Sequence, residues 1–243
     1  MKLFNKIRFK LLKGKQLTNY LVYASGEIIL VVIGILIALW INNWNNERQI
    51  ANTNRNLQEK VLVQLKRDIA VVDRFRTELD TLDQVYLKYL ERDYDKTKTV
   101  GKNVFSMILF EVTELGLDEH AVNWIDNAVL DNTKASEKLI DLSSTYKLYF
   151  KNIGDVERVI YDKITSNLEI LEKTQPWYTE LITDFSCKTD CVKFLLEDES
   201  HKARIASLRF IYIKAYGDIV NGFYYDLKNA KEALEDKIGI VKD

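Results

Sequence analysis

The amino-acid sequence predicts an all-α protein, with an N-terminal transmembrane helix followed by an up-and-down bundle of three or four long helices. The 243 residues include one proline, Pro176, and nine glycines, so long stretches of the chain lack helix breakers. Residues 21–41 form an apolar run with one charged side chain, Glu27. After residue 56, apolar residues recur mostly at three- and four-residue steps, which is the spacing of one face of an α-helix.

Residues 1–19 are predicted to form a basic cytoplasmic leader. Apolar residues alternate with Lys and Arg at helical steps, a pattern typical of a short amphipathic helix on an anionic membrane surface. Nucleic-acid binding is the weaker interpretation, because the segment adjoins a membrane anchor and contains no recognised motif. The basic residues are Lys2, Lys6, Arg8, Lys10, Lys13 and Lys15.

Residues 20–46 are predicted to form the transmembrane helix. A bilayer core of roughly 30 Å requires about 20 mostly apolar residues, and the apolar run has that length. Aromatic side chains at both ends fit the aromatic belts of membrane interfaces. A cleaved signal peptide is less favoured, because no small-x-small cleavage site follows the run. The predicted interface anchors are Tyr20, Tyr23, Trp40 and Trp44.

The distribution of basic residues predicts that the N-terminus lies in the cytoplasm. Six Lys and Arg precede the apolar run, whereas the first basic residue after it is Arg48, beside Glu47. The side richer in basic residues stays in the cytoplasm, so residues 47–243 are expected outside. Of the 35 Lys/Arg and 36 Asp/Glu, six bases and Glu27 precede residue 47, which leaves a net charge of about −6. This ordinary charge gives no indication of a nucleic-acid partner.

One face of the predicted span carries Glu27, Gly34 and Ala38. Small residues at such spacing let two helices approach closely, and an ionisable side chain within a span marks a function or a polar partner. The face therefore predicts that the span associates with another helix. The alternative is that Glu27 is solvated at the cytoplasmic interface without a partner. An ion or proton pathway is disfavoured, because one helix cannot line it alone.

The segment Leu57–Leu90 predicts a long amphipathic helix with nearly coiled-coil spacing. Charged residues flank its apolar stripe on both sides. No glycine or proline separates this segment from the span, so one helix is expected to continue to about Leu90. The stripe consists of Leu57, Val61, Leu65, Ile69, Val72, Phe75, Leu79, Leu82, Tyr86 and Leu90.

The rest of the chain divides into further helical stretches and one connector, which contains Pro176 and both cysteines. Gly116 is expected to end the first of these helices. In order, we expect a polar turn over Asp93–Asn103, a buried helix over Val104–Leu115, a helical stretch over Leu117–Leu130, a helix over Ser136–Lys173, a connector with short helical pieces over Thr174–Ser200, and a last helix over Ala203–Ile238.

Cys187 and Cys191 are the only cysteines, and a local disulfide is the leading interpretation for a pair outside the cytoplasm. Zinc binding is disfavoured, because two thiols need further ligands and the two histidines, His120 and His201, do not complete a known spacing. Neither histidine lies in a recognisable catalytic context, and no phosphate-binding loop is present. The sequence therefore predicts no catalytic residue, no metal and no cofactor.

Tyrosines on the last helix leave two interpretations open. Tyr212, Tyr216, Tyr224 and Tyr225 could line a ligand cleft, whereas packing in the core and at its rim is the more usual role of such residues.

The run Tyr23–Arg48, which reads YASGEIILVVIGILIALWINNWNNER, resembles the anchor of a family of uncharacterised bacterial single-span membrane proteins, classed as a domain of unknown function. The leader from Lys6 to Leu12 also looks like the start of that family. Where the family often has Gln, this chain has Trp40. The resemblance covers residues 6–48 and implies a Gram-negative inner-membrane protein with a periplasmic domain. It implies no activity, so no catalytic residue follows from it.

These observations predict a non-enzymatic scaffold or interaction subunit of an inner-membrane complex, anchored by one span and exposed to the periplasm. The stripe Leu57–Leu90 and the small-residue face of the span both favour association, either as a homo-oligomer or within a membrane complex. Membrane lipid is the other expected partner. The alternative is a periplasmic ligand-sensing module that signals through a partner protein, because the cytoplasmic part is too short to hold a signalling domain. An enzyme is the least favoured interpretation.

Overall fold

The computed structural model describes residues 17–91 and 103–238. The predicted leader helix lies outside the described residues, as does the predicted turn Asp93–Asn103 except for its last residue. The chain divides into two compact units, Met1–Asn54 and Arg55–Asp243. All regular elements within the described ranges are helices, which confirms the predicted all-α fold.

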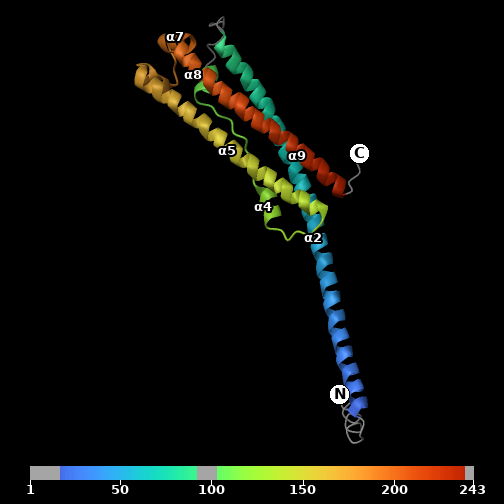
Figure 1. The fold of residues 1–243 in the computed structure, drawn as a ribbon. Coiled ribbons are helices and arrows are strands. Elements are labelled where there is room, and N and C mark those ends of the chain that lie inside the picture. Colours follow the sequence, from blue (N-terminus) through green and yellow to red (C-terminus); the bar gives the residue numbers. More distant parts are fainter. Residues whose placement is uncertain (1–16, 92–102, 239–243) are drawn as a thin grey trace. The chain divides into compact units, whose positions relative to one another are not determined.

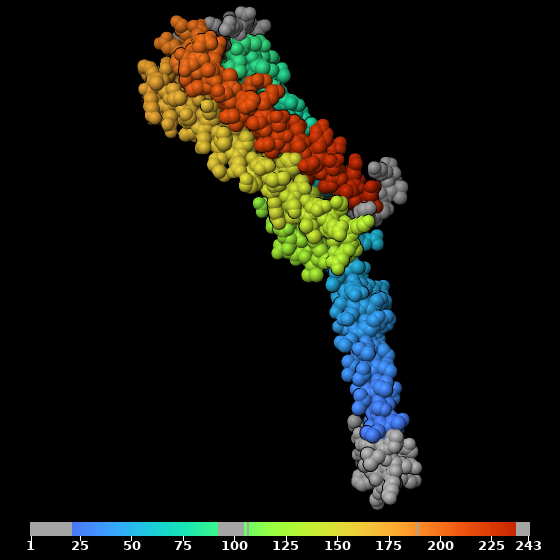
Figure 2. All heavy atoms as spheres, viewed as in Figure 1, coloured from blue at the N-terminus to red at the C-terminus, as the bar shows by residue number. Residues whose placement is uncertain are grey.

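The described part of the first unit is one helix, the N-terminal portion of α2 (Leu17–Leu90; blue in Figure 1). Among the described residues, the part of α2 that begins at Leu21 is the one helix long and apolar enough to cross a membrane, judged by length and composition. Large apolar side chains between Ile28 and Ile41 are 45–72% exposed. Figure 2 shows their atoms around a single helix. This helix agrees with the predicted candidate span.

The second unit is built on three long helical segments: the part of α2 after Asn54, α5 (Lys134–Thr174), and α9 (Tyr216–Ile238) with the elements leading into it. The predicted helix over residues 136–173 is therefore confirmed. Thr133 caps its start, because the Thr133 hydroxyl accepts a hydrogen bond from the Ser136 amide at 3.3 Å.

Figure 1 shows α2 and α5 running in the same direction, with α9 running back against them. Hydrogen bonds record the antiparallel register of α5 and α9. The Tyr149 hydroxyl donates to Asp226 at 2.8 Å, and farther along α5 the Glu157 carboxylate accepts from the Tyr216 hydroxyl. As α5 advances by eight residues, its partner on the other helix goes back by ten. The bundle is thus up-and-down, with α2 and α5 as its ascending segments.

The segment that descends between α2 and α5 differs from the sequence-based expectation. A short helix, α3 (Asn103–Leu109), is followed by extended chain over residues 111–118 and by α4 (His120–Asp126). The predicted helix Val104–Leu115 therefore ends six residues early, and Gly116 does not end it. Tyrosine hydroxyls from the last helical segment bind the backbone of Thr113 and Leu115, and these contacts replace the hydrogen bonds of a helix.

The connector between α5 and the last helical segment contains the short helical pieces that the sequence predicts. These are α6 (Tyr178–Asp184) and α7 (Thr189–Glu197). The last segment begins with α8 (Glu199–Arg209), where the Asp198 side chain caps the first turn by accepting from the His201 amide at 2.6 Å.

Between α8 and α9 the chain forms one turn of π-helix, η1 (Phe210–Ala215). The expectation of a continuous α-helix from Ala203 to Ile238 is therefore wrong over these six residues. A π-turn widens the helix by one residue and redirects the side chains that follow it, and such turns are frequent at functional sites. The three- and four-residue spacing of apolar residues continues across the turn, so the sequence pattern does not reveal it.

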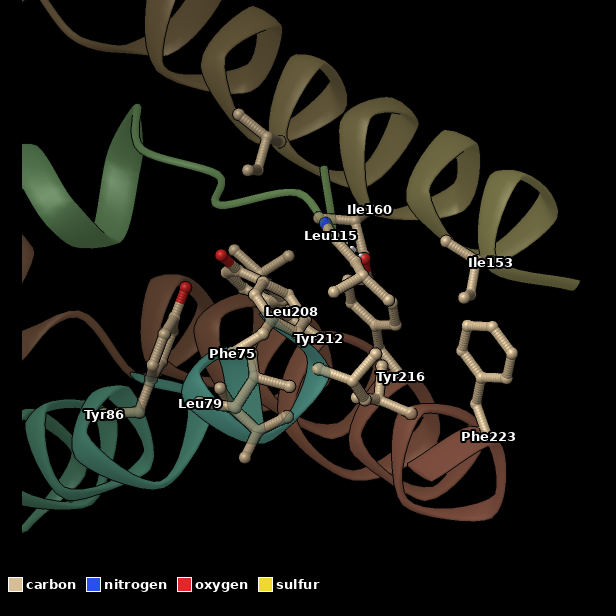
Figure 3. Packing of buried hydrophobic residues seen from close by; sticks show 14 of the residues in the cluster. Phe75, Leu79, Tyr86, Leu115, Ile153, Ile160, Leu208, Tyr212, Tyr216 and Phe223 are labelled. Atoms are coloured by element: carbon tan, nitrogen blue, oxygen red, sulfur yellow. Dashed lines mark hydrogen bonds between the residues drawn. The ribbon is translucent and has the colours of Figure 1, made fainter. Parts of the chain in front are cut away.

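The hydrophobic core runs along the second unit between the three long helices. The apolar stripe of α2 is part of that core: Val61, Leu65, Val72 and Tyr86 are fully buried, and Leu79 is 4% exposed. Burying each such side chain contributes about 1.5–3 kcal/mol. The stripe is thus covered by helices of its own chain, so it does not present a free coiled-coil seam. Figure 3 shows the middle of the core, where aromatic side chains from α2 and the last helical segment meet.

Candidate functional site

The predicted association face of the span is uncovered within the chain. Glu27, Gly34 and Ala38 are spaced by seven and four residues, so they share one helix face. Ala24 and Gly26 nearby are partly shielded, whereas the three residues of the face are exposed. A side chain at Gly34 would meet no described atom within 4 Å. The face is therefore free to contact a second helix or lipid.

The predicted interface anchors lie at the two ends of the same helical segment. Trp40 and Trp44 are 69% and 54% exposed, and the Arg48 guanidinium lies 5.9 Å from the ring centre of Trp44. Tyr23 is half-buried, and the side chain of Tyr20 lies outside the described residues.

Cys187 and Cys191 are joined by a disulfide, with their Cα atoms 5.2 Å apart. Cys191 is buried, and the bridge links the first turn of α7 to the loop before it. Phe185 in that loop has a left-handed backbone conformation, with φ of 47°, and its side chain is 75% exposed. The bridge therefore constrains the loop between α6 and α7 against the start of α7.

The two histidines occupy different environments, and neither resembles a catalytic site. His120 is exposed, with its Nδ1 atom 2.8 Å from Asp118, and its ring stacks on Trp124 at 5.8 Å between centres. The Lys60 ammonium also lies over the Trp124 ring, 3.6 Å from its centre. Within the described ranges, no three His, Cys, Asp or Glu residues are placed to hold a metal ion.

His201 is fully buried and its protonation state follows from its contacts. The Tyr89 hydroxyl donates to the Leu195 carbonyl at 2.5 Å and lies 3.0 Å from the Nε2 atom of His201. Because the Tyr89 hydroxyl already donates its proton to Leu195, it must accept the hydrogen bond from His201. The imidazole proton therefore lies on Nε2. Nδ1 has no hydrogen-bond partner among the described residues. Burial lowers the pKa of His201 to about 4, with Arg204 adding to the effect, so the ring is neutral at pH 7.

A second polar cluster lies in the core between α2 and α5. The Asp68 carboxylate accepts from the Tyr146 hydroxyl at 2.5 Å and from the Gln64 amide at 2.9 Å. Burial raises the pKa of Asp68 in spite of these two donors. All three side chains are buried, so the cluster fixes the register of the two helices and is closed to a ligand.

The tyrosines of the last helical segment hold the extended chain 111–118 in place. The Tyr212 hydroxyl accepts from the Thr113 amide at 2.6 Å, and the Tyr216 hydroxyl accepts from the Leu115 amide at 3.0 Å. Tyr216 also donates to Glu157 of α5. Figure 3 shows the Tyr216 side chain directed at the Leu115 backbone. The sequence leaves open whether these tyrosines line a cleft or pack in the core. Tyr216 packs in the core and binds the backbone of the extended chain.

Tyr212 has a further role, because it lines a cavity of about 370 Å³. The cavity lies between α2, α3, the extended chain and η1, and most of its wall is apolar. Its volume falls within the range of small-molecule sites. The lining residues are Arg74, Phe75, Thr77, Glu78, Leu79, Thr81, Leu82, Met107, Thr113 and Tyr212.

Sequence reasoning does not identify this cavity. Arg74 and Glu78 read as ordinary charged flanks of the apolar stripe, and Met107 falls in a stretch predicted to be a longer helix. The one available signal is Tyr212, which the sequence names as a potential cleft residue. Tyr224 and Tyr225 do not line the cavity; their rings lie 4.2 and 5.7 Å from the Arg76 guanidinium.

No protein-family model, curated protein or solved structure matches the chain. The resemblance of residues 6–48 to a family of bacterial membrane anchors therefore stays a prediction.

Proposed function

We propose that the protein is a non-enzymatic interaction subunit of a bacterial inner membrane, anchored by one span, with residues 47–243 in the periplasm. The observation that carries this proposal is the contrast between two apolar surfaces of α2. Most of the stripe after Leu57 is covered by the protein's own helices, whereas the large apolar side chains from Ile28 to Ile41 are exposed. Association through α2 therefore uses the span.

The chemistry of the span supports this role. Lipid removes the hydrophobic driving force between helices, so association depends on close packing and on polar contacts. Gly34 and Ala38 permit close packing, and Glu27 supplies a polar group on the same face. The expected partners are a second copy of this chain or the span of another subunit.

The association test compares two substitutions in a membrane two-hybrid assay. Gly34→Ile places a branched side chain on the face and is expected to weaken association at least several-fold. Val32→Ile changes the opposite side of the helix by one methylene group and is expected to leave the signal unchanged. Equal signals from both variants would show that this face does not mediate association.

The orientation is tested with reporters fused after Asp243. A reporter active only in the periplasm is expected to be active, and one that fluoresces only in the cytoplasm is expected to be dark. The reverse pattern would overturn the periplasmic location.

The apolar cavity favours a second candidate function, a ligand-sensing module that acts through a partner. Part of the cavity wall, Phe75 to Leu82, belongs to α2, the helix that also contains the candidate span. A cavity of this size beside a π-turn is a feature that a purely structural bundle does not need.

A further inference from the structure

The cavity on α2 has walls suited to an apolar group. Phe75, Leu79 and Leu82 of α2 form one wall, and Met107 of α3 and the ring of Tyr212 complete it. Phe75, Leu79 and Tyr212 are at most 4% exposed, so they form a fixed base of the cavity, whereas the half-buried Leu82 and Met107 present its accessible apolar surface. A preformed apolar surface of this kind binds a hydrophobic side chain without first having to be ordered.

The hydroxyl groups around the cavity are engaged within the protein. Thr77 donates to the Asp73 carbonyl at 3.1 Å, and Thr81 donates to the Thr77 carbonyl at 2.9 Å. The Tyr212 hydroxyl is bound to the backbone of Thr113. The hydroxyls of Thr77 and Thr81 therefore have no proton left to donate to a ligand, and the two charged residues of the lining are its strongest polar partners.

The charged residues of the lining are Arg74 and Glu78, four residues apart on α2. Side chains at this spacing are neighbours on one helix face, with Cβ atoms roughly 6 Å apart. Both are exposed, and no ion pair is formed by either one with the described residues.

We propose that this cavity binds a free amino acid with an apolar side chain. The ligand's carboxylate pairs with the Arg74 guanidinium, its ammonium group pairs with the Glu78 carboxylate, and its side chain packs on Leu82 and Met107. An amino acid carries both charges on groups attached to one carbon atom, which matches two opposite charges one helical turn apart. A simple carboxylic acid or amine would satisfy only one of them. This proposal rests on the second candidate function, and it names the ligand class.

The test measures binding to the full-length protein in mild detergent by isothermal titration calorimetry. Three probes share one hydrocarbon body: L-leucine, 4-methylpentanoate, which lacks the ammonium group, and 3-methylbutylamine, which lacks the carboxylate. Leucine is expected to bind at least tenfold more tightly than either analogue. No binding of leucine, or an analogue that binds equally well, would overturn the proposal.

Two variants assign the charges. Arg74→Gln removes the partner of the carboxylate, so it is expected to bind leucine only as tightly as the parent protein binds 3-methylbutylamine. Glu78→Gln removes the partner of the ammonium group, so it is expected to bind leucine only as tightly as the parent binds 4-methylpentanoate. Arg67→Gln is the matched control, because Arg67 is an exposed arginine of α2 that does not line the cavity. If Arg74→Gln and Glu78→Gln bind leucine as the parent does, the assigned contacts are wrong. The association of the span is measured separately with Gly34→Ile, so a failure of ligand binding leaves that result intact.

Discussion

The two apolar regions of α2 have opposite environments, although one helix contains both. From Leu21 to Ile41 the apolar residues surround the helix, and the large ones after Ile28 are 45–72% exposed. From Leu57 to Leu90 the apolar residues form one stripe between charged flanks, and most of that stripe is buried in the second unit. The angular distribution of apolar residues, more than their number, therefore tells a span from a core helix.

The comparison also separates two ways of associating. A stripe at nearly heptad spacing resembles a coiled-coil seam, and its sequence alone does not tell whether the partner is another chain or another helix of the same chain. Here the partners are α5 and the last helical segment, so pairing two copies through the stripe would require the bundle to open. The exposed span needs no such opening.

The largest effect is expected from removing a side chain of the buried stripe. Leu65 is fully buried, and Leu65→Ala should destabilise the second unit by about 3 kcal/mol, because it loses apolar contact and leaves a cavity. Leu36, which is 58% exposed, provides the matched substitution in the span. Leu36→Ala should leave the unfolding of the bundle unchanged.

Pulse proteolysis across a urea series, with the full-length protein in detergent, measures both variants. The midpoint for Leu65→Ala should fall to clearly lower urea. Equal midpoints for Leu65→Ala and the parent protein would mean that the stripe is not part of the core and that the contrast with the span fails.

Helix content and the position of long helices could be predicted from the sequence, because apolar periodicity and the scarcity of breakers act locally. Helix α5 was expected over residues 136–173 and is observed over Lys134–Thr174. The chain between α3 and α4 could not be predicted in the same way. Its residues Glu111–Leu115 are as apolar as many helices, and its extended form depends on hydroxyl groups about 100 residues later in the chain.

A smaller effect, confined to acid pH, is expected from His201, which joins the C-terminal end of the α2 stripe to α7 and α8 through Tyr89. Its pKa falls from 6.5 to about 4 on folding, so the unfolded chain binds the proton more readily. Stability is therefore fully present above pH 6.5 and is lost as the pH falls toward 4, by about 2.5 kcal/mol at pH 4.5.

Urea unfolding at pH 7.0 and pH 4.5 tests this linkage. His201→Phe should lose less stability between these pH values than the parent does, whereas His120→Gln, which changes an exposed ring, should behave as the parent. Because the pKa of Asp68 is raised on folding, its contribution to stability above pH 3.8 increases as the pH falls, opposite to that of His201. All three proteins contain Asp68, so this contribution cancels in the comparison. An unchanged pH dependence in His201→Phe would contradict the buried, neutral imidazole.

The candidate sites show the same difference. Some can be predicted from residues close in the sequence, whereas others depend on contacts between distant residues. Glu27, Gly34 and Ala38 could be placed on one face from helical spacing alone. The disulfide partners could be paired because the chain has only two cysteines. The cavity could not be found, since its wall comes from α2, α3, the extended chain and η1, which are separated along the sequence.

The smallest expected effect concerns Tyr216, which links the extended chain to the core beside the α2 stripe. Tyr216→Phe removes a hydroxyl that accepts from the Leu115 amide and donates to Glu157. Because the Glu157 carboxylate lies 3.3 Å from the same amide and can keep it partly satisfied, the loss should be only about 1 kcal/mol. Tyr225→Phe, at a side chain 57% exposed, should cost nothing measurable.

Hydrogen exchange gives the sharper readout: the Leu115 amide should exchange faster in Tyr216→Phe, while amides in the middle of α5 keep their protection. If Leu115 remains as protected as in the parent, the tyrosine does not hold the extended chain, and its burial serves core packing alone.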